Sequence, residues 1–531
     1  MSGINRLRQY APLESQTSVV KRTLVREENQ VVRHQHSGSG FYFGTNVAGK
    51  RPNKVYAASK ITDNTHSMAR TPRPADGDIR RAINILRARS REEYQSNDYA
   101  KKAVNIIKQN VIGSTGIRFQ ATPKRRNGEK DKPASDALEV GFKRWGKRGS
   151  PDVTAKLSWK DIQNLFVHSL VVDGEAIVVE PSAWQRNSYG FAVQFVDPFL
   201  LDSELNKDLK NGNRIRMGVE IDRWGAPVAY YFLEHDVTQD DYRLNFQREH
   251  VRIPAGRVLH IYMPEYVVQT RGVPLLATSL LRFNMLRGYE DAELVAARVA
   301  AAKMGFFIDA DDGSGFQGDT KDGDQSYIDA AEPGHFPRLP AGTDFKEWDP
   351  QHPNTAFEGY LKAVLRGAAA GLNVPYNTMA NDLEGVNFSS LRAGNLDAHD
   401  GWKCFQELIV ESLCDWTYEK WLSASLLRNV LEVRPGVPLN PALHEKYSDV
   451  KWVPRRWDHV QPFEQERANQ LKIQNRTSSI SQIIRDQGRE PEDVFEEISE
   501  ERQRLVDLGI PLELETSSNE EQTETGTEAN N

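Results

Sequence analysis

The spacing of apolar residues predicts helices in the N-terminal part of the chain. One helix is predicted to begin after a cap at Ser96 or Asn97 and to end at Gly113, with apolar residues recurring on one of its faces. That face is formed by Ala100, Ala103, Val104, Ile107 and Val111. Residues 134–148 show the same amphipathic spacing, and residues 77–90 predict one short helix in an otherwise irregular arm.

The pattern changes to strands between residues 159 and 263. DIQNLFVHSLVVDGEAIVVEP predicts a helix that runs into a strand pair around Asp173–Gly174, and FAVQFVDPFLLD and RVLHIYM predict further strands. In NRIRMGVEIDRWGAPVAYYFLE, apolar and polar residues alternate before the turn DRWGAP, and VAYYFL returns after it. The stretch therefore predicts a hairpin whose first strand carries Ile215, Met217, Val219 and Ile221.

Long helices return after residue 263. The first covers roughly residues 275–303, about 45 Å at the usual helical rise, and the second covers about 355–372. A third helix begins after a cap at Ser389 or Ser390 and ends near residue 427, with an apolar stripe along one side. The stripe consists of Trp402, Phe405, Ile409, Leu413 and Trp416.

Together these elements predict an α+β protein of several modules, because 531 residues are too many for one compact core. Residues 305–350 predict short strands and turns, and residues 463–510 predict a highly charged helical segment. The longest apolar stretch, AELVAARVAAAKMGFFI, contains Arg298 and Lys303 and does not fit a membrane span. The segment MSGINRLRQYAPLESQ has no apolar core of the signal-peptide type.

Charge is unevenly distributed along the chain. The formal net charge is −6, yet residues 1–90 carry 16 Lys and Arg against 6 Asp and Glu. A basic arm of this kind is usually a flexible extension, and its alternative use is contact with nucleic acid or an acidic partner. Residues 511–531 carry six Glu and no basic residue, which predicts a disordered tail.

No pattern in the chain predicts catalysis, a cofactor or a metal. Residues 44–50 match part of a phosphate-binding loop, but Arg51 stands where Ser or Thr would bind Mg²⁺. The acidic run 309–324 departs from the spacing of a calcium-binding loop. Cys404 and Cys414 exclude a disulfide framework and a cysteine zinc site, and predict buried thiols in a reducing compartment. His260 lies in a predicted strand and is interpreted as a structural histidine.

Several long stretches share their order and spacing with one protein family. They are YAKKAVNIIKQNVIGSTGIRFQ; DGEAIVV followed by VQFVDP; GVEIDRWGAPVAYYF; RVLHIYMPEYVVQTRGVPLLATSLLRFNMLRGYEDAELVAARVAAAK; and LPAGTDFKEWDPQHPNTAFEGYLKAVLRGAAAGLNVPYNTMANDLEGVNFSSLRAG. From about residue 99 to residue 510, the chain resembles the portal (head–tail connector) proteins of tailed double-stranded-DNA bacteriophages, in the lambda-like branch.

The resemblance implies an α+β portal fold with a wing, a helical stem, a β-containing clip and a helical crown, assembled as a ring that is usually dodecameric. The ring would sit at one capsid vertex and pass DNA inward during packaging and outward during ejection. The implied parts are a basic arm (1–90), a wing (91–273), a first stem helix (274–304), a clip (305–354), a second stem helix (355–374), a tunnel loop (375–391), a long wing helix with the segment after it (392–462), a crown (463–511) and an acidic tail (512–531).

The same resemblance implies partners, and no enzyme activity or cofactor. The partners are other copies of the chain, double-stranded DNA, the terminase large subunit, head–tail connector or neck proteins, and the major capsid and scaffold proteins, with no membrane. The implied location is the portal vertex of the virion, after assembly in the host cytoplasm.

The composition of the implied tunnel loop fits a channel for DNA. From Gly367 to Leu391 there is no Lys or Arg, whereas Asp382 and Glu384 are present. Lys and Arg strengthen DNA binding because they displace counterions from phosphates, so a loop without them is expected to let the duplex slide. The DNA-channel residues are Asn377, Asn381, Asp382, Glu384, Gly385 and Asn387. Without the resemblance, an ordinary surface turn would be the first interpretation.

Small residues on the two implied stem helices predict close helix packing. The partner helix lies either in the neighbouring subunit of the ring or in the same subunit, since a helical stripe does not reveal what it faces. The residues are Ala296, Ala297, Ala300, Ala301, Ala368, Ala369 and Ala370.

Two other function classes remain open from the sequence alone. One is an enzyme, specifically the packaging ATPase, which would need an intact nucleotide site. The other is a static DNA-binding protein that uses the basic arm, which would bind short duplexes tightly and lose affinity steeply with salt.

Overall fold

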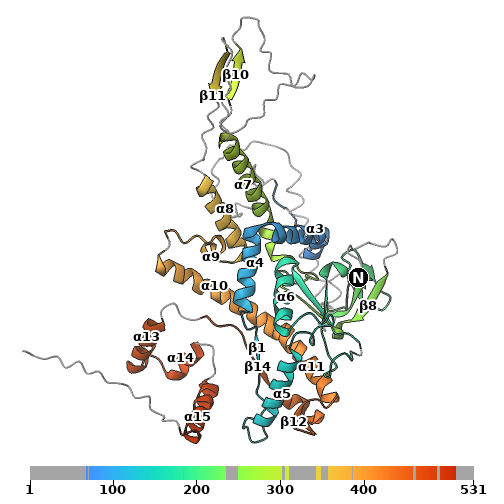
Figure 1. The fold of residues 1–531 in the computed structure, drawn as a ribbon. Coiled ribbons are helices and arrows are strands. Elements are labelled where there is room, and N and C mark those ends of the chain that lie inside the picture. Colours follow the sequence, from blue (N-terminus) through green and yellow to red (C-terminus); the bar gives the residue numbers. More distant parts are fainter. Residues whose placement is uncertain are drawn as a thin grey trace, which may run out of the picture. The chain divides into compact units, whose positions relative to one another are not determined.

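The computed structural model describes most of the chain. The described residues are 67–69, 71–182, 184–234, 249–301, 305–309, 343–347, 357–385, 387–457, 462–486 and 491–509. The chain divides into a unit of residues 1–72 and a unit of residues 73–531. The second unit combines helices with small antiparallel sheets (Figure 1), which confirms the predicted α+β class.

Two helices open the second unit and meet at Asn97. Helix α3 spans Ala75–Ser96 and α4 spans Asp98–Val111. The Asn97 side chain accepts hydrogen bonds from the backbone N–H groups of Tyr99 and Ala100, two of the donors that a helix N-terminus leaves free. The predicted cap at Asn97 is confirmed, as is the buried stripe of α4. Helix α3 runs through the expected arm boundary at residue 90, so that boundary was placed too late.

Helix α6 carries the chain into the first sheet as predicted, but a single strand follows Asp173–Gly174 and not the predicted strand pair around these residues. It spans Trp159–Val172 and begins at a capping box, in which Ser158 and Asp161 satisfy each other's backbone N–H groups. Asp173 and Gly174 then link α6 to strand β2, Glu175–Val179, all of whose residues are buried. The helix packs against both α4 and β2, which places it in the main core.

Two antiparallel sheets share an apolar core. One has the strand order β3-β2-β9 and the other β4-β5-β6-β7-β8. Apolar side chains from β2, β6, β7 and β9 form a common buried cluster. The bounds are β3 Gln194–Val196, β4 Lys207–Asp208, β5 Arg214–Arg216, β6 Val219–Ile221, β7 Pro227–Leu233, β8 His250–Pro254 and β9 Val258–Tyr262.

The predicted hairpin of residues 213–234 is a three-stranded meander instead. Met217 and Gly218 have φ values of 46° and 81° and form a turn between β5 and β6. Two successive residues in the left-handed region cannot continue a strand. Gly218 favours such a turn but Met217 does not, so the alternation of apolar residues was misleading here. The second turn, DRWGAP, lies where it was predicted.

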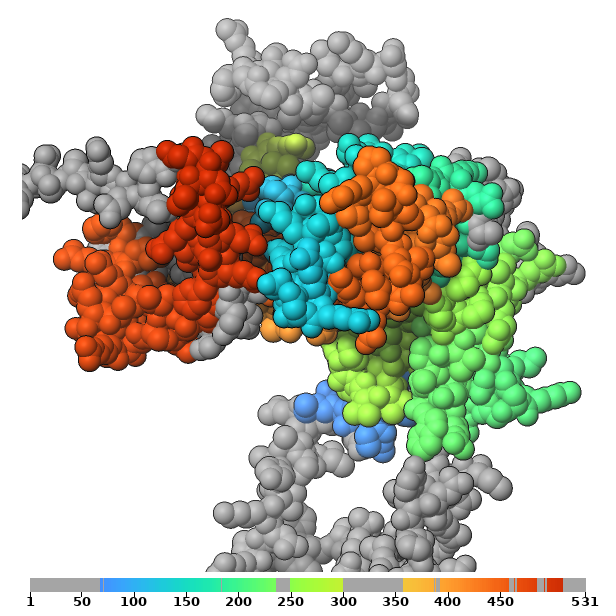
Figure 2. Space-filling model, turned by 90° about the horizontal axis from the view of Figure 1, so that it is seen from below, coloured from blue at the N-terminus to red at the C-terminus, as the bar shows by residue number. Residues whose placement is uncertain are grey.

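An aromatic core joins segments that are far apart in the sequence. Strand β1, Arg118–Ala121, pairs with β14, Val450–Val453, and helix α5, Lys132–Trp145, packs beside them. Figure 2 shows the cyan surface of α5 against the orange surface of residues 415–434. Gly141 makes this approach possible, because a Cβ there would lie 2.5 Å from a methyl carbon of Leu431. The neighbouring rings are Phe119, Phe142, Trp145, Trp159, Tyr418, Trp421 and Trp452.

The next two helices lie side by side (Figure 1). A 3₁₀ turn, Leu275–Thr278, precedes helix α7, Leu280–Ala301, and α8 spans Phe357–Leu372. The predicted first helix is therefore interrupted at Ser279. Between these helices, β10 (Gly305–Asp309) and β11 (Thr343–Glu347) pair antiparallel.

A long, nearly continuous helix follows a short one. Helix α9 spans Tyr376–Ala380, and α10 (Phe388–Ile409) continues through a π-helical turn into α11 (Asp415–Leu427). Ser389 and Ser390 lie inside the first turn of α10, so the predicted cap at these residues is wrong. In the predicted stripe, Trp402, Ile409 and Leu413 are buried and Phe405 and Trp416 are half-buried.

The remaining elements are short or highly charged, as predicted for the C-terminal end. They are β12 Glu432–Arg434, β13 Val437–Pro438, α12 His444–Tyr447, α13 Pro462–Gln474, α14 Ile480–Asp486 and α15 Pro491–Asp507. Both cysteines are free. The expectation of buried thiols holds for Cys414, which is buried, and is wrong for Cys404, which is exposed.

The described ranges contain no helix long and apolar enough to cross a membrane. They also contain no group of three or more His, Cys, Asp or Glu placed to hold a metal ion. Residues 44–50, residues 310–324, the basic arm up to residue 66 and the acidic tail lie outside the described residues.

Two glycines allow a close approach of backbone segments beside strand β2. A Cβ on Gly174, whose φ is 85°, would lie 2.2 Å from the carbonyl carbon of Val273. A Cβ on Gly272 would lie 2.0 Å from the carbonyl oxygen of Gly174. The backbone on each side therefore leaves no room for a side chain at either position.

Replacement of Gly174 by Ala should destabilise the protein strongly. Gly225 is a matched control, because its φ is 92° but nothing lies within 4 Å of a Cβ there. Both substitutions incur the left-handed strain of about 1–2 kcal/mol, and Gly174→Ala adds an overpacking cost of about 1–3 kcal/mol. Unfolding by denaturant would measure the difference, and equal losses of stability would contradict the close approach.

Candidate functional site

The predicted tunnel loop of residues 375–391 is partly helical. Helix α9 occupies residues 376–380 and α10 begins at Phe388, so the loop proper is reduced to 381–387. Asn377 lies on α9 and is half-buried, and Asn381 ends that helix in the left-handed conformation, with a φ of 53°. Gly385 has a φ of 67° and open space around it, and Glu384 and Asn387 are exposed.

Asp382 is held by hydrogen bonds from its own segment. The Tyr376 hydroxyl donates to Oδ2 of Asp382 at 2.8 Å, and the Glu384 backbone N–H donates to Oδ1 at 3.1 Å. The Tyr376 hydrogen bond is the main reason that the pKa of Asp382 is lowered, with smaller contributions from the Glu384 N–H and nearby cations. Asp382 is therefore ionised at neutral pH.

Helix α8 places a cation directly beside the acidic residues of the loop. The Nζ atom of Lys362 lies 3.8 Å from Asp382, 3.6 Å from Glu384 and 2.5 Å from Glu358 on its own helix. The hydrogen bond with Glu358, followed by the loop carboxylates, raises the pKa of Lys362. The loop itself carries no Lys or Arg, but its two acids pair with a lysine from outside the loop.

Arg366 joins the same group from the next turn of α8. Its guanidinium carbon lies 5.2 Å from the centre of the Tyr376 ring, a cation–π contact. Residues 358, 362 and 366 are spaced by four and share one face of α8, which faces α9 and the loop. Sequence reasoning missed Lys362 and Arg366 because they precede the loop; the spacing E-x-x-x-K-x-x-x-R was the available signal.

The alanines expected to pack between subunits divide into two groups. Ala368 and Ala369 are buried within the chain, and the Ser279 hydroxyl donates to the Ala368 carbonyl at 3.0 Å. For these two the intrasubunit alternative holds, because the 3₁₀ turn before α7 already covers them. Ala297 and Ala370 are exposed and Ala296 is half-buried, whereas the side chains of Ala300 and Ala301 lie outside the described part.

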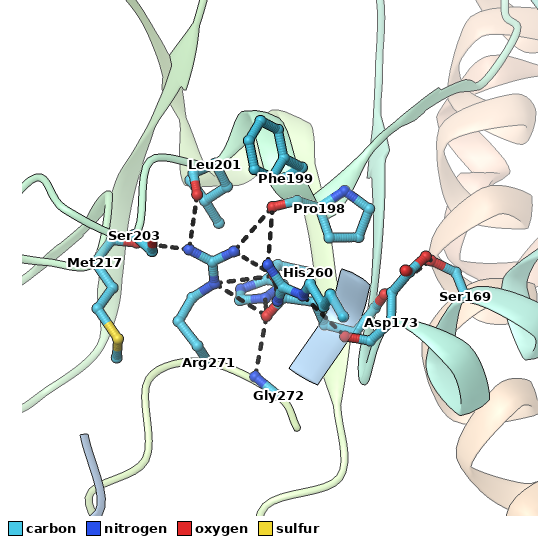
Figure 3. A network of polar contacts seen from close by, with 12 residues as sticks. Ser169, Asp173, Pro198, Phe199, Leu201, Ser203, Met217, His260, Arg271 and Gly272 are labelled. Atoms are coloured by element: carbon cyan, nitrogen blue, oxygen red, sulfur yellow. Dashed lines mark hydrogen bonds and ion pairs between the residues drawn. The ribbon is translucent and has the colours of Figure 1, made fainter. Parts of the chain in front are cut away.

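A buried charge network lies at the junction of α3, β2 and β9 (Figure 3). The Glu175 carboxylate is fully buried and binds Arg271, which is also fully buried, as well as Arg87, whose Nη2 lies 2.6 Å away. It also accepts a hydrogen bond from the Gly272 backbone N–H at 3.0 Å and lies 3.0 Å from Nε2 of His260.

Arg271 connects this carboxylate to several chain segments. Its Nη1 donates to the carbonyls of Leu201 and Met217 at 2.9 and 2.8 Å, and its Nη2 donates to the carbonyl of Pro198 at 3.0 Å. In Figure 3 the Arg271 guanidinium points toward these carbonyls and toward His260. The partners of Arg271 thus fix the turn between β5 and β6.

Burial opposes the ionisation of Glu175, but the charges of Arg271 and Arg87 outweigh it and hold the pKa of Glu175 well below its usual range. Burial lowers the pKa of Arg87 to about 10, so this guanidinium stays charged at neutral pH. Glu175, Arg87 and Arg271 each face an opposite charge or a carbonyl. The interpretation of His260 as structural fits the burial of its side chain against Glu175.

Comparison with known proteins places the chain in a family. The family model described as "Phage portal protein, lambda family" matches residues 62–406. The chain belongs to the lambda family of phage portal proteins. A protein named "Probable portal protein" from Halomonas phage phiHAP-1 is 37% identical over 441 residues, which cover 82% of this chain and 83% of that protein. "Portal protein B" of Escherichia phage lambda is 23% identical over 385 residues, covering 65% of this chain and 69% of its own.

A solved neck of a native GTA particle, computed with C12 symmetry, matches with 12% identity and covers 77% of this chain and 94% of that one. Its TM-score is 0.41, so the assignment rests on the sequence matches. The chain is therefore a phage portal protein, a structural component of the DNA-packaging channel and not an enzyme. The packaging ATPase is accordingly set aside.

Replacement of Glu175 by Gln should destabilise the core around β2 and β9. The variant leaves two buried guanidinium groups without their counter-charge, and removal of one partner of a buried ion pair costs about 3–5 kcal/mol. Asp400→Asn is the control, since it removes the exposed pair with Lys403 and should leave the unfolding midpoint unchanged. Similar midpoints for both variants, measured by denaturant unfolding, would disprove the role of the network.

The same carboxylate should govern part of the stability at acid pH. Because the pKa of Glu175 is lowered on folding, its ion pairs stabilise the fold fully above about pH 4.3, the usual Glu value, and this stabilisation is lost as the pH falls further. Unfolding measured between pH 6 and pH 3 should therefore show a shallower loss of stability in Glu175→Gln than in the wild type. Parallel pH profiles would contradict the lowered pKa.

Proposed function

We propose that the chain forms a ring, of about twelve copies as is usual for its family, whose inner surface includes the loop 381–387 and the adjoining face of α8. Membership in the portal family, matched over residues 62–406, is the observation that carries this proposal. The loop acids, the exposed Glu384 and the half-buried Asp382, support it, because an anionic surface lines a path for DNA without holding it.

The physical reason lies in how proteins bind DNA. Each phosphate contact by Lys or Arg displaces counterions and adds affinity, so a channel lined by free cations would retain the duplex. Residues 367–391 contain no Lys or Arg, and the two cations of α8 that approach the loop are already paired or stacked. The duplex can therefore pass with weak, exchangeable contacts.

We further propose how the remaining elements serve the ring. Helices α7 and α8 act as the stem, with Ala296, Ala297 and Ala370 available to a neighbouring copy. The strands β10 and β11 belong to the clip, which docks the terminase large subunit and later the neck proteins. The sheets around β2 and helices α10 and α11 form the wing toward the major capsid and scaffold proteins, and α13–α15 form the crown.

The portal vertex of the virion is the site of action that the family implies, with assembly in the host cytoplasm as part of the proposal. Static DNA binding through the basic arm is the second candidate function. It predicts tight, salt-sensitive binding of short duplexes, whereas a portal predicts weak binding and large rings.

Electron microscopy of the purified protein should display rings with a central hole. Replacement of both Asp382 and Glu384 by Lys should leave ring assembly intact but reduce the yield of DNA-filled heads, because a cationic loop would hold the duplex. Asp400→Lys, on the exposed side of α10, is the control and should package normally. Particles without a hole would refute the ring, and normal packaging by the double variant would refute the role of the loop.

A further inference from the structure

The acidic loop and the cations of α8 form a small group that the proposed channel does not by itself require. Lys362 is surrounded by three carboxylates, those of Glu358, Asp382 and Glu384. Arg366 stacks on Tyr376, whose hydroxyl in turn donates to Asp382. The loop acids thus lie where the phosphates of a bound polyanion would lie.

We propose that Asp382 and Glu384 mask a latent DNA-phosphate site formed by Lys362 and Arg366 on α8. The inference rests on the proposed function, in that the loop must border the DNA. In this arrangement the loop acids take the place that two phosphate groups would otherwise occupy.

The contacts of the loop acids with Lys362 are of the exchangeable kind, although Asp382 also accepts a hydrogen bond from the Tyr376 hydroxyl at 2.8 Å. The Nζ atom of Lys362 lies 3.8 Å from Asp382 and 3.6 Å from Glu384, longer than a direct charge-assisted hydrogen bond. The Glu384 side chain is 82% exposed, so water and salt weaken its ion pair. The buried pair of Glu175 and Arg271 has no such access to water, which marks the loop contacts as the ones that DNA can displace.

Displacement of the loop reverses the local charge. With the loop in place, three carboxylates face two cations, so the local net charge is −1. With Asp382 and Glu384 moved away, only Glu358 remains beside Lys362 and Arg366, so the local net charge becomes +1. Repeated around a ring, a small movement of the loop would convert a repelling collar into a gripping one.

Backbone features permit this movement. Gly385 has a φ of 67°, and a Cβ built there would meet nothing within 4 Å, so this position tolerates a change of backbone conformation. Asn381 also occupies the left-handed region, which places a permissive residue on each side of the two acids. The loop can therefore pivot without disturbing the buried part of α8.

The test is duplex binding by the assembled protein and its variant D382N/E384Q over a range of salt concentrations. These substitutions preserve shape but remove both masking charges. We expect affinity at low salt to rise by about threefold or more, and the salt dependence to steepen by about 0.9 for each additional phosphate that the protein neutralises. Unchanged affinity and slope would overturn the proposal.

Two further variants make the result specific. E204Q/D400N is the matched control, since it neutralises two exposed acids paired with Arg80 and Lys403 away from the loop, and its binding should equal that of the wild type. The addition of Lys362→Met to D382N/E384Q should return the salt dependence most of the way to the wild-type value. An equal rise in affinity in the control, or a rise that survives the loss of Lys362, would overturn the proposal.

Hydrogen exchange provides a readout that does not depend on DNA. Lys362→Met alone should speed exchange at the Glu384 amide, which donates to Asp382, while duplex binding does not rise. Unaltered exchange would show that Lys362 does not hold the loop and would overturn the mask. Failure of the wild type to form rings would refute the proposed function instead, and electron microscopy of the same samples separates the two.

Discussion

A single buried carboxylate, that of Glu175 on β2, links helix α3, strand β9 and the loop after β9. Glu175 would be unstable as an isolated charge in the core, and it is tolerated because Arg87 and Arg271 lie against it. These two arginines come from α3 and from the loop after β9, and they also bind carbonyls of the intervening segments. Removal of Glu175 would leave both buried guanidinium groups without their shared counter-charge, so the network links the segments that carry its members.

The chain uses two kinds of electrostatic contact for two purposes. Around Glu175, charges are excluded from water and each nitrogen of Arg271 has a partner, which gives one rigid arrangement. Around Lys362, the contacts with the loop are longer and partly exposed, so they compete with water, salt and phosphate. The rigid network suits a scaffold, and the exchangeable contacts suit the proposed role of the loop as a surface past which a duplex slides.

These properties fit a portal protein. A portal must hold its shape against the capsid while its inner surface neither blocks nor binds the DNA that passes. Close backbone approaches at Gly174 and Gly272 contribute to the stiffness, and the open space around Gly385 contributes to the freedom of the loop. The buried Ala368 and Ala369 also contribute to this stiffness, since α8 packs there against the turn before α7.

Elements with local signals could be predicted from the sequence alone. The helical stripe of α4, the cap at Asn97 and the turn at DRWGAP follow from short-range periodicity and turn chemistry, and the family follows from the order of longer stretches. Which charges meet depends instead on how distant segments pack. Arg87, Glu175 and Arg271 are far apart along the chain, so no helical or strand period could indicate that they meet. Lys362 reaches the loop because α8 packs against α9. Periodicity reports which face of an element is buried, whereas the partner on that face depends on how distant segments pack.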